Sequence, residues 1–522
     1  MRKLFAISFL LFSFAAKAQE QTTYAGNINQ AFLKKHLTVI ASAEMEGRET
    51  GTAGERKAAA YIEDYFKALG LTTAPGLNGY QQYFPLHKDS LKSAELEIDG
   101  KEASFGKDYI SPAAMNETGK FKSDNIVFVG YGIEDEAYSD YKNVDVKGKT
   151  VIFFSGEPKA DGKSLIPGGA RGSQWTFPGL PKKLEVAKKN GAVGAFVITP
   201  SMAEFSERAI TGSRRTNVYY PRENSATLNF ASLSHAFGAS ILGGKAEELM
   251  KKAKDGASFT AGDYFTIGKK AELKIKRDRE IIRSSNVVGV LEGSDRKDEY
   301  VFLTAHYDHV GIRDGKIHYG ADDDGSGTVG VMAMAEAFAK AKKEGKGPRR
   351  TIIFMLFSGE EKGLWGSEYY SENPFYPLDK TTVNLNTDMV GRIDTERMSA
   401  DTQNYVYVIG HDKISSELQP ISEGANKKYT NLVFDYKFDD PKDPHRIYFR
   451  SDHYNFARKG VPVLFFYDGM LKADYHKPTD TVDKINWELY EKRVKMIFHT
   501  AWEMANRDAM LKRDTPLNMG ER

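Results

Sequence analysis

The 522-residue sequence contains no cysteine. This absence excludes a disulfide framework, a thiolate metal site and a cysteine nucleophile. Any metal ion must therefore be held by His, Asp and Glu side chains. Such ligands suit zinc when imidazole and carboxylate are combined, or harder cations when oxygen alone is used.

A strong charge of either sign is also missing. The formal net charge is +2, and it falls close to neutral once the basic residues of the first eighteen positions are set aside. Nucleic acid and anionic lipid are bound through a basic face, so we expect neither of them as a partner.

One long apolar run interrupts this balance, "LFAISFLLFSFAA" at residues 4–16. It is shorter than the roughly 20 residues that a membrane-spanning helix needs. Basic residues precede it and small residues follow it, as in a secretory signal peptide. We expect residues 1–18 to be removed between Ala18 and Gln19, which gives a periplasmic or secreted protein with no stable membrane insertion.

The rest of the chain divides into segments that differ in the spacing of their apolar residues. Apolar spacing predicts a helix over 55–70. Residues 122–270 hold short apolar runs between Gly, Pro and charged loops, with a helix expected near 181–191, and indicate a separate β-rich module. From about 284 onward, strand and helix patterns alternate. Near-continuous apolar runs there predict an α/β fold, with a central sheet covered by helices on both faces.

Within this C-terminal part, residues 286–293 and 299–308 are expected to form neighbouring antiparallel strands. Ligands of open α/β sheets bind at the carboxyl ends of the strands, and polar residues follow each expected strand. These residues are His306, Asp308 and His309, then Asp322, Asp323 and Asp324, then Glu360 and Glu361, then Asp388, and finally His476.

Each of these groups has a simpler interpretation when taken alone. His306 with Asp308 is also typical of a buried, hydrogen-bonded histidine, and Glu360 with Glu361 of a solvated charge pair. Polar caps do not explain five such endings at one edge of a sheet. The convergence therefore indicates bound cations.

The aspartate triplet also resembles the opening of an EF-hand calcium loop counted from Asp322. Position 12 of that loop falls on Ala333, where a bidentate Glu is required, and no helix pattern precedes the loop. The better interpretation places the aspartates just before a helix N-terminus, with metal ions cancelling the remaining repulsion.

Two histidines and at least three carboxylates exceed what one tetrahedral zinc ion can use, so two metal ions sharing a carboxylate are expected. Paired ions about 3.5 to 4 Å apart can hold a hydroxide and polarise a carbonyl. A carboxylate that binds no metal then serves as general base. This pattern predicts hydrolysis of an amide or ester.

Five motifs in this order carry a family resemblance: "TAHYDHVG", "GADDDGSG", "LFSGEEKGLWGS", "LNTDMVGR" and "DYHKPTDT". They resemble the co-catalytic di-zinc exopeptidases, which include bacterial leucyl aminopeptidases and glutamate carboxypeptidase. Residues 122–270 are similar to the protease-associated insert of larger members. The resemblance makes 19–121 the N-terminal segment of the peptidase domain and 271–522 its metal-binding part.

The resemblance also implies roles for single residues. It places His306 and Asp388 on one zinc ion, Glu361 and His476 on the other, and Asp323 between both. Glu360 is implied as the general base, Asp308 as the acid behind His306, and Tyr475 as the donor to the oxyanion.

An exported aminopeptidase acting on peptides is the function that this resemblance favours. A carboxypeptidase or dipeptidase of the same fold stays open, and it would need a cationic clamp such as Arg392 or Arg450. A glutaminyl cyclase with one zinc and a non-catalytic protein like the transferrin receptor are further alternatives. Manganese or cobalt would also suit these ligands.

Overall fold

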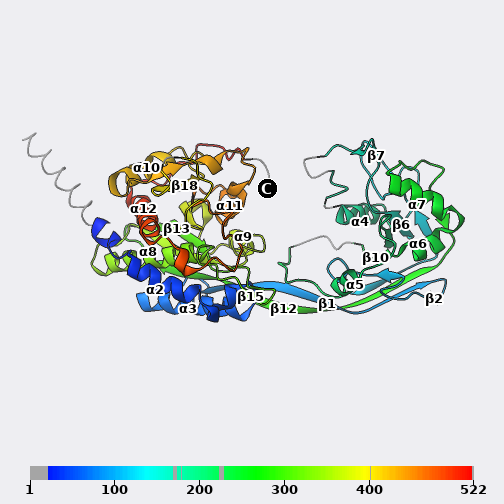
Figure 1. Ribbon diagram of the computed structural model, residues 1–522, viewed down its shortest axis with the longest axis horizontal. Coiled ribbons are helices and arrows are strands. Elements are labelled where there is room, and N and C mark those ends of the chain that lie inside the picture. Colours follow the sequence, from blue (N-terminus) through cyan, green and yellow to red (C-terminus); the bar gives the residue numbers. More distant parts are fainter. Residues whose placement is uncertain (1–20, 169–172, 178, 223–227, 400, 520–522) are drawn as a thin grey trace, which may run out of the picture. The chain divides into compact units, whose positions relative to one another are not determined.

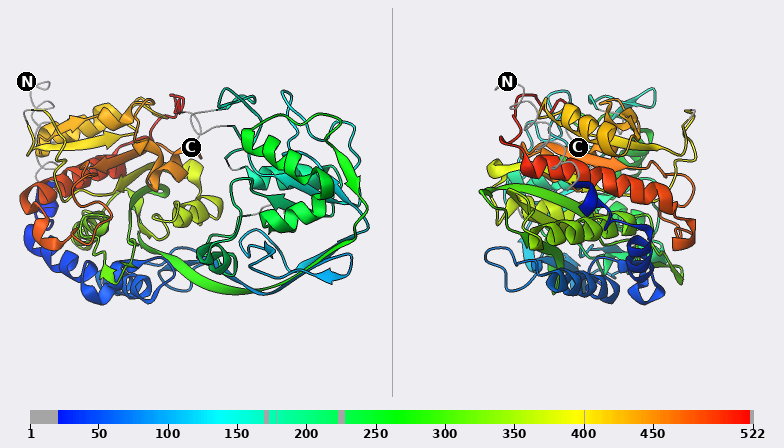
Figure 2. Two further views of the ribbon diagram at one scale, coloured as in Figure 1. Left: turned by 45° about the vertical axis from the view of Figure 1, so that its right-hand side comes forward. Right: turned by 90° about the vertical axis from the view of Figure 1, so that its left-hand side faces the viewer.

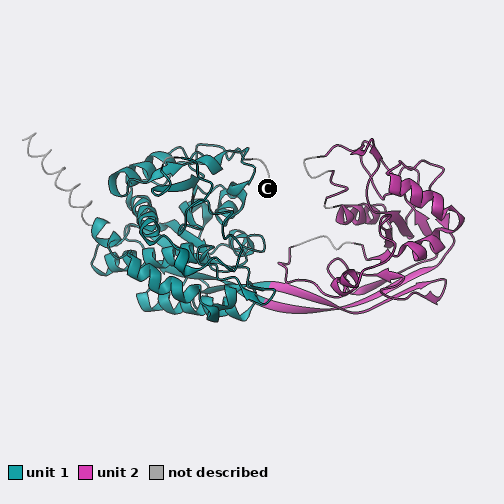
Figure 3. Cartoon of the chain, in the orientation of Figure 1, with its two compact units in different colours: residues 1–85, 283–522 teal, residues 86–282 magenta. Residues whose placement is uncertain are grey.

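The computed structural model describes residues 21–519 apart from 169–172, 178, 223–227 and 400. The chain forms two compact units, residues 1–85 with 283–522 and residues 86–282 (Figures 1 and 3). The expected signal peptide lies outside the described residues. None of the described helices has both the length and the apolar character needed to cross a bilayer.

The first unit is built on a mixed β-sheet, which confirms the predicted α/β class. In order across the sheet its strands are β19 (Val433–Asp435), β18 (Tyr405–Ile409), β20 (Val463–Tyr467), β17 (Thr381–Thr387), β13 (Arg296–His306), β16 (Arg350–Phe357), β12 (Ala271–Leu291), β1 (Gln81–Ile98) and β2 (Lys101–Glu102). Strand β4 (Gly119–Ser123) also pairs with β12. Strands β20, β17, β13 and β16 run parallel to one another. Strands β18 and β12 flank them in the antiparallel direction.

The expected pairing of 286–293 with 299–308 is wrong. These segments lie in β12 and β13, and both pair with β16, which lies between them. The apolar runs identify each strand as buried, but they carry no information about which neighbour supplies its hydrogen bonds.

Helices cover both faces of this sheet. They are α2 (Gln30–Ile40), α3 (Ala53–Leu69), α8 (Gly325–Lys343), α9 (Trp365–Glu372), α10 (Leu418–Tyr429), α11 (His453–Ala457) and α12 (Trp487–Asn506), the long red helix in Figure 2. Along β13, Val301 and Leu303 belong to the buried cluster that includes residues of α2, α3, α8 and α12, whereas the ring of Phe302 contacts α9 and α11 on the other face. This alternation is the period of a strand buried on both faces.

Helix α3 ends as its sequence predicts. Its apolar positions Ala58, Ile62 and Phe66 are buried. Gly70 adopts a left-handed conformation at φ 78°, and its N–H donates to the carbonyl of Lys67. A glycine accepts this conformation without the steric cost that a Cβ would add.

The second unit has a sheet and a core of its own. Its strands follow the order β11 (Phe265–Ile267), β5 (Ile126–Phe128), β6 (Thr150–Phe154), β9 (Gly194–Ile198), β10 (Phe230–Leu233) and β3 (Tyr109–Ile110). The helices are α4 (Leu180–Lys189), α5 (Glu207–Ser213), α6 (His235–Leu242) and α7 (Ala246–Asp255). Helix α4 matches the helix expected near 181–191. The segment 122–270 expected as an insert lies within this unit.

Candidate metal centre

The candidate residues gather at the carboxyl ends of the parallel strands. His306 is the last residue of β13, Asp388 directly follows β17, and Glu360 and Glu361 follow β16. Asp323 lies on the loop just before α8. Parallel strands end at the same edge of a sheet, so residues far apart in the sequence reach one place.

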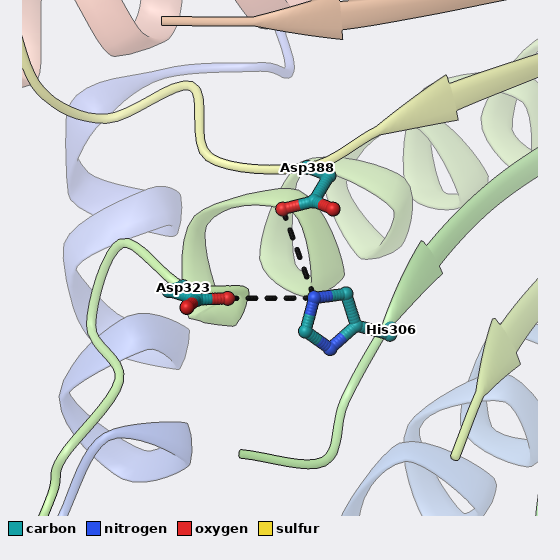
Figure 4. Close-up of side chains that lie close together, drawn as sticks. All are labelled: His306, Asp323 and Asp388. Atoms are coloured by element: carbon teal, nitrogen blue, oxygen red, sulfur yellow. Dashed lines mark ion pairs between the residues drawn. The ribbon is translucent and has the colours of Figure 1, made fainter. Parts of the chain in front are cut away.

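His306 lies at the centre of a first group of ligand atoms (Figure 4). Its Nε2 is 3.4 Å from Oδ1 of Asp323 and 3.7 Å from Oδ1 of Asp388. Oε2 of Glu360 is 3.8 Å from the same nitrogen. His306 and Asp323 are buried. Separations of this size are those of ligand atoms that surround one ion at about 2.0 to 2.2 Å each.

A second group uses the other oxygen of Asp323. Nε2 of His476 lies 3.2 Å from Oδ2 of Asp323 and 2.8 Å from Oε2 of Glu361. Nδ1 of His309 lies 2.8 Å from Oε1 of Glu361. Asp323 therefore presents one oxygen to each group, as a bridging carboxylate would.

The outer aspartates of the triplet hold the backbone around Asp323. Asp324 caps α8, because its Oδ1 accepts from the N–H of Gly327 at 2.8 Å. The same carboxylate accepts from the N–H groups of His306 and Met389, which ties the ends of β13 and β17 together. Asp322 accepts from the N–H of Gly391. Asp322 and Asp324 thus accept hydrogen bonds from backbone N–H groups, whereas the Asp323 carboxylate faces the histidines.

The loop after β13 sets the tautomer of His306. Nδ1 of His306 lies 3.0 Å from the main-chain carbonyl of Asp308 and 3.5 Å from its carboxylate. The carbonyl can only accept, so it keeps the proton on Nδ1 and leaves Nε2 free for a metal ion. The Asp308 carboxylate accepts from the hydroxyl of Thr50 and from the N–H of Glu360.

Several buried atoms of these groups have no hydrogen-bond partner among the described residues. They are Oδ2 of Asp323, Oε1 of Glu361, Nε2 of His476 and both ring nitrogens of His309. A buried polar atom without a partner costs about 1 to 3 kcal/mol. Because imidazole nitrogens and carboxylate oxygens face one another here, metal ions would satisfy the atoms of Asp323, Glu361 and His476 and one ring nitrogen of His309. The residues therefore fit a pair of zinc ions.

The pKa values of Glu360 and Asp323 are shifted in opposite directions. Burial raises the pKa of Glu360 well above its ordinary value, with His306 acting against the shift. Burial acts in the same direction on Asp323, but the imidazoles of His306 and His476 outweigh it and hold that pKa well below the usual range. Glu360 is thus the carboxyl group that holds a proton more readily, as a general base requires.

A pocket lies beside the first group. Its wall includes Met389, Ile447, Phe465 and Leu471, and its polar lining includes His306, Asp323, Glu360, Asp388, Arg450 and Tyr475. The guanidinium of Arg450 donates to the Tyr475 hydroxyl at 3.0 Å. Tyr475 therefore lies at the same pocket as the candidate metal-binding residues of the first group and Glu360.

The sequence motifs give no role to Arg48. Arg48 is fully buried, and its guanidinium donates to the carbonyls of Tyr307, Tyr319 and Gly320. Those carbonyls belong to the two loops that carry His306 and Asp323. An arginine between glycine-rich turns was the available signal, but its partners are known only from the fold.

Comparisons with known proteins identify the class. Residues 286–501 match the family described as Peptidase family M28. The chain is 26% identical over 373 residues to a "Probable leucine aminopeptidase" of Arthroderma otae, covering 67% of this chain and 94% of that one. It is 27% identical over 254 residues to "Aminopeptidase YwaD" of Bacillus subtilis, covering 47% of this chain and 50% of that one.

Among solved structures, an aminopeptidase from Aneurinibacillus sp. strain AM-1 aligns with a TM-score of 0.49 and 16% identity, covering 96% of this chain and 98% of that one. The match covers about half or less of the length of some curated relatives, such as YwaD and "Aminopeptidase Y" of Saccharomyces cerevisiae.

An α/β domain with buried histidines and carboxylates at its strand ends, together with these relatives, defines a metallopeptidase. Residues 286–501 carry the match to peptidase family M28. The sequence-based identification of a co-catalytic zinc exopeptidase is therefore confirmed.

Proposed function

We propose that this protein is a di-zinc aminopeptidase that removes N-terminal residues from peptides. One observation carries the proposal: the two oxygens of Asp323 face two separate groups of ligand atoms, with Glu360 beside the first. The aminopeptidase names of the relatives support the choice of substrate end.

Five side chains would hold the two ions. His306 and Asp388 serve one ion, Glu361 and His476 the other, and Asp323 both. When bound, the ions would polarise the scissile carbonyl and make a water molecule more acidic near neutral pH.

Glu360 moves the proton of the reaction. Its carboxylate takes a proton from the attacking water and gives it to the leaving amine. Its main-chain N–H donates to Oδ1 of Asp308 at 3.2 Å, and the same loop supplies the carbonyl that holds His306. The base and the first metal-binding histidine are thus positioned together.

Tyr475 stabilises the negative charge that develops on the carbonyl oxygen. Because Arg450 donates to the oxygen of the Tyr475 hydroxyl, the hydroxyl hydrogen is free to point elsewhere in the pocket. A donor aimed at the developing oxyanion typically contributes 10²- to 10³-fold to turnover.

A carboxypeptidase or dipeptidase is a second candidate, favoured by one observation. Such an enzyme needs a cation for the substrate carboxylate, and Arg450 lines the pocket. Arg392, the other candidate from the sequence, is held by Asp474 at 2.8 Å and Asp480 at 3.8 Å. Arg450 is therefore the residue on which this alternative depends.

A panel of substrates tests the proposal. We expect the zinc-loaded enzyme to cleave aminoacyl-anilides and peptides with a free N-terminus, and a chelator to abolish the activity. N-blocked peptides with a free C-terminus should resist cleavage. Preferential cleavage of those peptides, with loss in Arg450→Gln, would establish the carboxypeptidase instead. Cyclisation of N-terminal glutamine would indicate the cyclase.

The remaining parts of the proposal concern the second unit and export. We propose that residues 122–270, which lie within the compact unit 86–282, are the protease-associated insert; the separate core and sheet of that unit support this. Export follows from the apolar run 4–16, with cleavage between Ala18 and Gln19. N-terminal sequencing of protein recovered from the periplasm or medium tests it, since Gln19 should be the first residue.

A further inference from the structure

His309 is the one buried imidazole of the centre to which the sequence motifs give no role. Its side chain has no exposed surface. Nδ1 lies 2.8 Å from Oε1 of Glu361 and 3.8 Å from Oδ2 of Asp323. Neither ring nitrogen makes a well-aligned hydrogen bond to any described residue. A neutral imidazole in such a place lacks the donor or acceptor that burial normally demands.

The position of this ring is fixed on several sides. The main-chain N–H of His309 donates to the carbonyl of Arg48 at 3.1 Å, which fixes the backbone that carries the ring. A Cβ at Gly320 would lie 2.6 Å from Cγ and Cδ2 of His309, so the ring packs directly against that glycine. The ring of His476 meets it edge-on with centroids 5.7 Å apart. The ring cannot turn toward other partners without displacing these neighbours.

The two groups of ligand atoms are unequal once His309 is included. The first group contains Nε2 of His306 and oxygens of Asp323 and Asp388. The second contains Nδ1 of His309 with oxygens of Asp323 and Glu361, and Nε2 of His476 faces the same two carboxylates. The first group thus offers three protein residues and the second offers four.

We propose that His309 is a further ligand of the metal ion held by Glu361 and His476, which gives that ion four protein ligands and its neighbour three. This inference rests on the proposed two-metal function. Zinc sites with four protein ligands are typically structural, whereas catalytic sites keep a position open. The ion of the second group is therefore held more tightly, and the ion of the first group exchanges and meets the substrate.

The competing role for His309 is a hydrogen bond from Nδ1–H to Glu361, which would orient that carboxylate without binding metal. Asparagine separates the two roles. Its amide can donate to a carboxylate, but it is a poor zinc ligand compared with imidazole. His309→Asn should therefore preserve a donor role and abolish a ligand role.

The experiment is a zinc titration of the full-length chain after chelation, read by calorimetry and by the metal content after dialysis. We expect wild type to bind two ions with unequal affinity. In His309→Asn and His309→Gln the tighter site should weaken by at least about 10- to 100-fold, the range found when outer groups of a metal site are altered. Cobalt-loaded protein should also change its visible absorption spectrum.

His499→Gln is the matched control, because His499 is a buried histidine that stacks on Tyr429 away from the ligand groups. It should bind both ions as wild type does. If His309→Asn also does so, the ligand role is wrong. A wild-type chain that binds no zinc would instead contradict the proposed function itself.

A variant-free measurement covers the case in which both substitutions prevent folding. In a crystal structure of zinc-loaded wild type, Nδ1 of His309 should lie about 2.0 to 2.1 Å from one ion. A distance above about 3 Å to both ions would overturn the ligand role.

Discussion

The buried charged groups of the second unit and those of the metal centre in the first unit differ in their hydrogen bonds. In residues 86–282, the buried carboxylate of Asp140 accepts from the N–H groups of Tyr131 and Ile133 at 3.0 Å and from the Tyr138 hydroxyl at 2.7 Å. Lys183, also buried, donates to main-chain carbonyls at the end of β6. In the first unit, by contrast, buried nitrogens and oxygens of the metal centre face one another without such donors and acceptors.

The difference separates structural charges from functional ones. A charge that serves stability is surrounded by groups of the same chain, because an unpaired buried charge is costly. A charged group that binds a ligand has a nitrogen or oxygen atom without a protein partner until the ligand is bound. Burial alone does not distinguish the two cases, but the state of the hydrogen bonds does.

The largest effect is expected for Glu360→Gln. The amide cannot accept the proton of the attacking water, so turnover should fall by about 10²- to 10⁴-fold. Both zinc ions should stay bound, because Glu360 is not among the proposed ligands. Steady-state kinetics together with metal analysis check this. Near wild-type turnover would show that another group is the base.

Substituting one buried aspartate in each unit tests the comparison directly. Asp388→Ala should lose the ion of the first group, with little change in the free energy of unfolding of the metal-free chain. Asp140→Ala should keep both ions but lower the free energy of unfolding by about 3 to 5 kcal/mol, because several buried donors lose their acceptor. Metal content and denaturant titration provide the two readouts. Loss of zinc in Asp140→Ala would contradict the separation.

The dependence of stability on pH should have opposite signs for two buried groups. Burial raises the pKa of Glu55 in the first unit to about 7 from 4.5. The folded state then binds more protons than the unfolded chain between these values, so stability falls as pH rises through this window, by about 3 kcal/mol in all. Glu55→Gln should remove that part of the slope.

Burial lowers the pKa of Lys183 in the second unit to about 7 from 10.5. The unfolded chain binds more protons between these values, so stability rises with pH there. Lys183→Met should flatten this rise. Denaturant titrations at a series of pH values, with each variant beside wild type, measure both slopes. A shared sign for the two groups would contradict the assignment.

Removal of metal should affect one unit only. An ion at 100 times its dissociation constant stabilises the state that binds it by about 2.7 kcal/mol. Chelation should therefore lower the unfolding temperature of the first unit and leave that of residues 86–282 unchanged. Differential scanning calorimetry with and without chelator measures this. An equal shift of both transitions would mean that the units do not unfold independently.

Much of this arrangement was predictable because it depends on local patterns. Helical spacing and Gly70 define α3, and the apolar runs define the parallel strands whose ends carry the metal-binding groups. The family resemblance implied Asp323 as the shared carboxylate, and its two oxygens lie near His306 and His476 respectively. The aspartates on either side of it were placed correctly before a helix N-terminus.

What the sequence did not reveal depends on contacts between distant segments. The place of β16 between β12 and β13 is a choice of hydrogen-bond partner that hydrophobicity does not encode. The motif "TAHYDHVG" shows that His309 is present, but the direction of its ring depends on Gly320 and Arg48. Likewise, the resemblance implied Asp308 as the acid behind His306, whereas the main-chain carbonyl of Asp308 makes the shorter contact with that ring.

The guanidinium of Arg48 also bears on the order in which the protein assembles. It is made early in synthesis, yet two of its carbonyl partners, Tyr307 and Gly320, lie 259 and 272 residues further along the chain. Until those loops have been synthesised, the guanidinium of Arg48 lacks these carbonyl partners. The peptidase unit can therefore close only after the whole intervening segment has emerged, and an unfinished chain has no active centre to release.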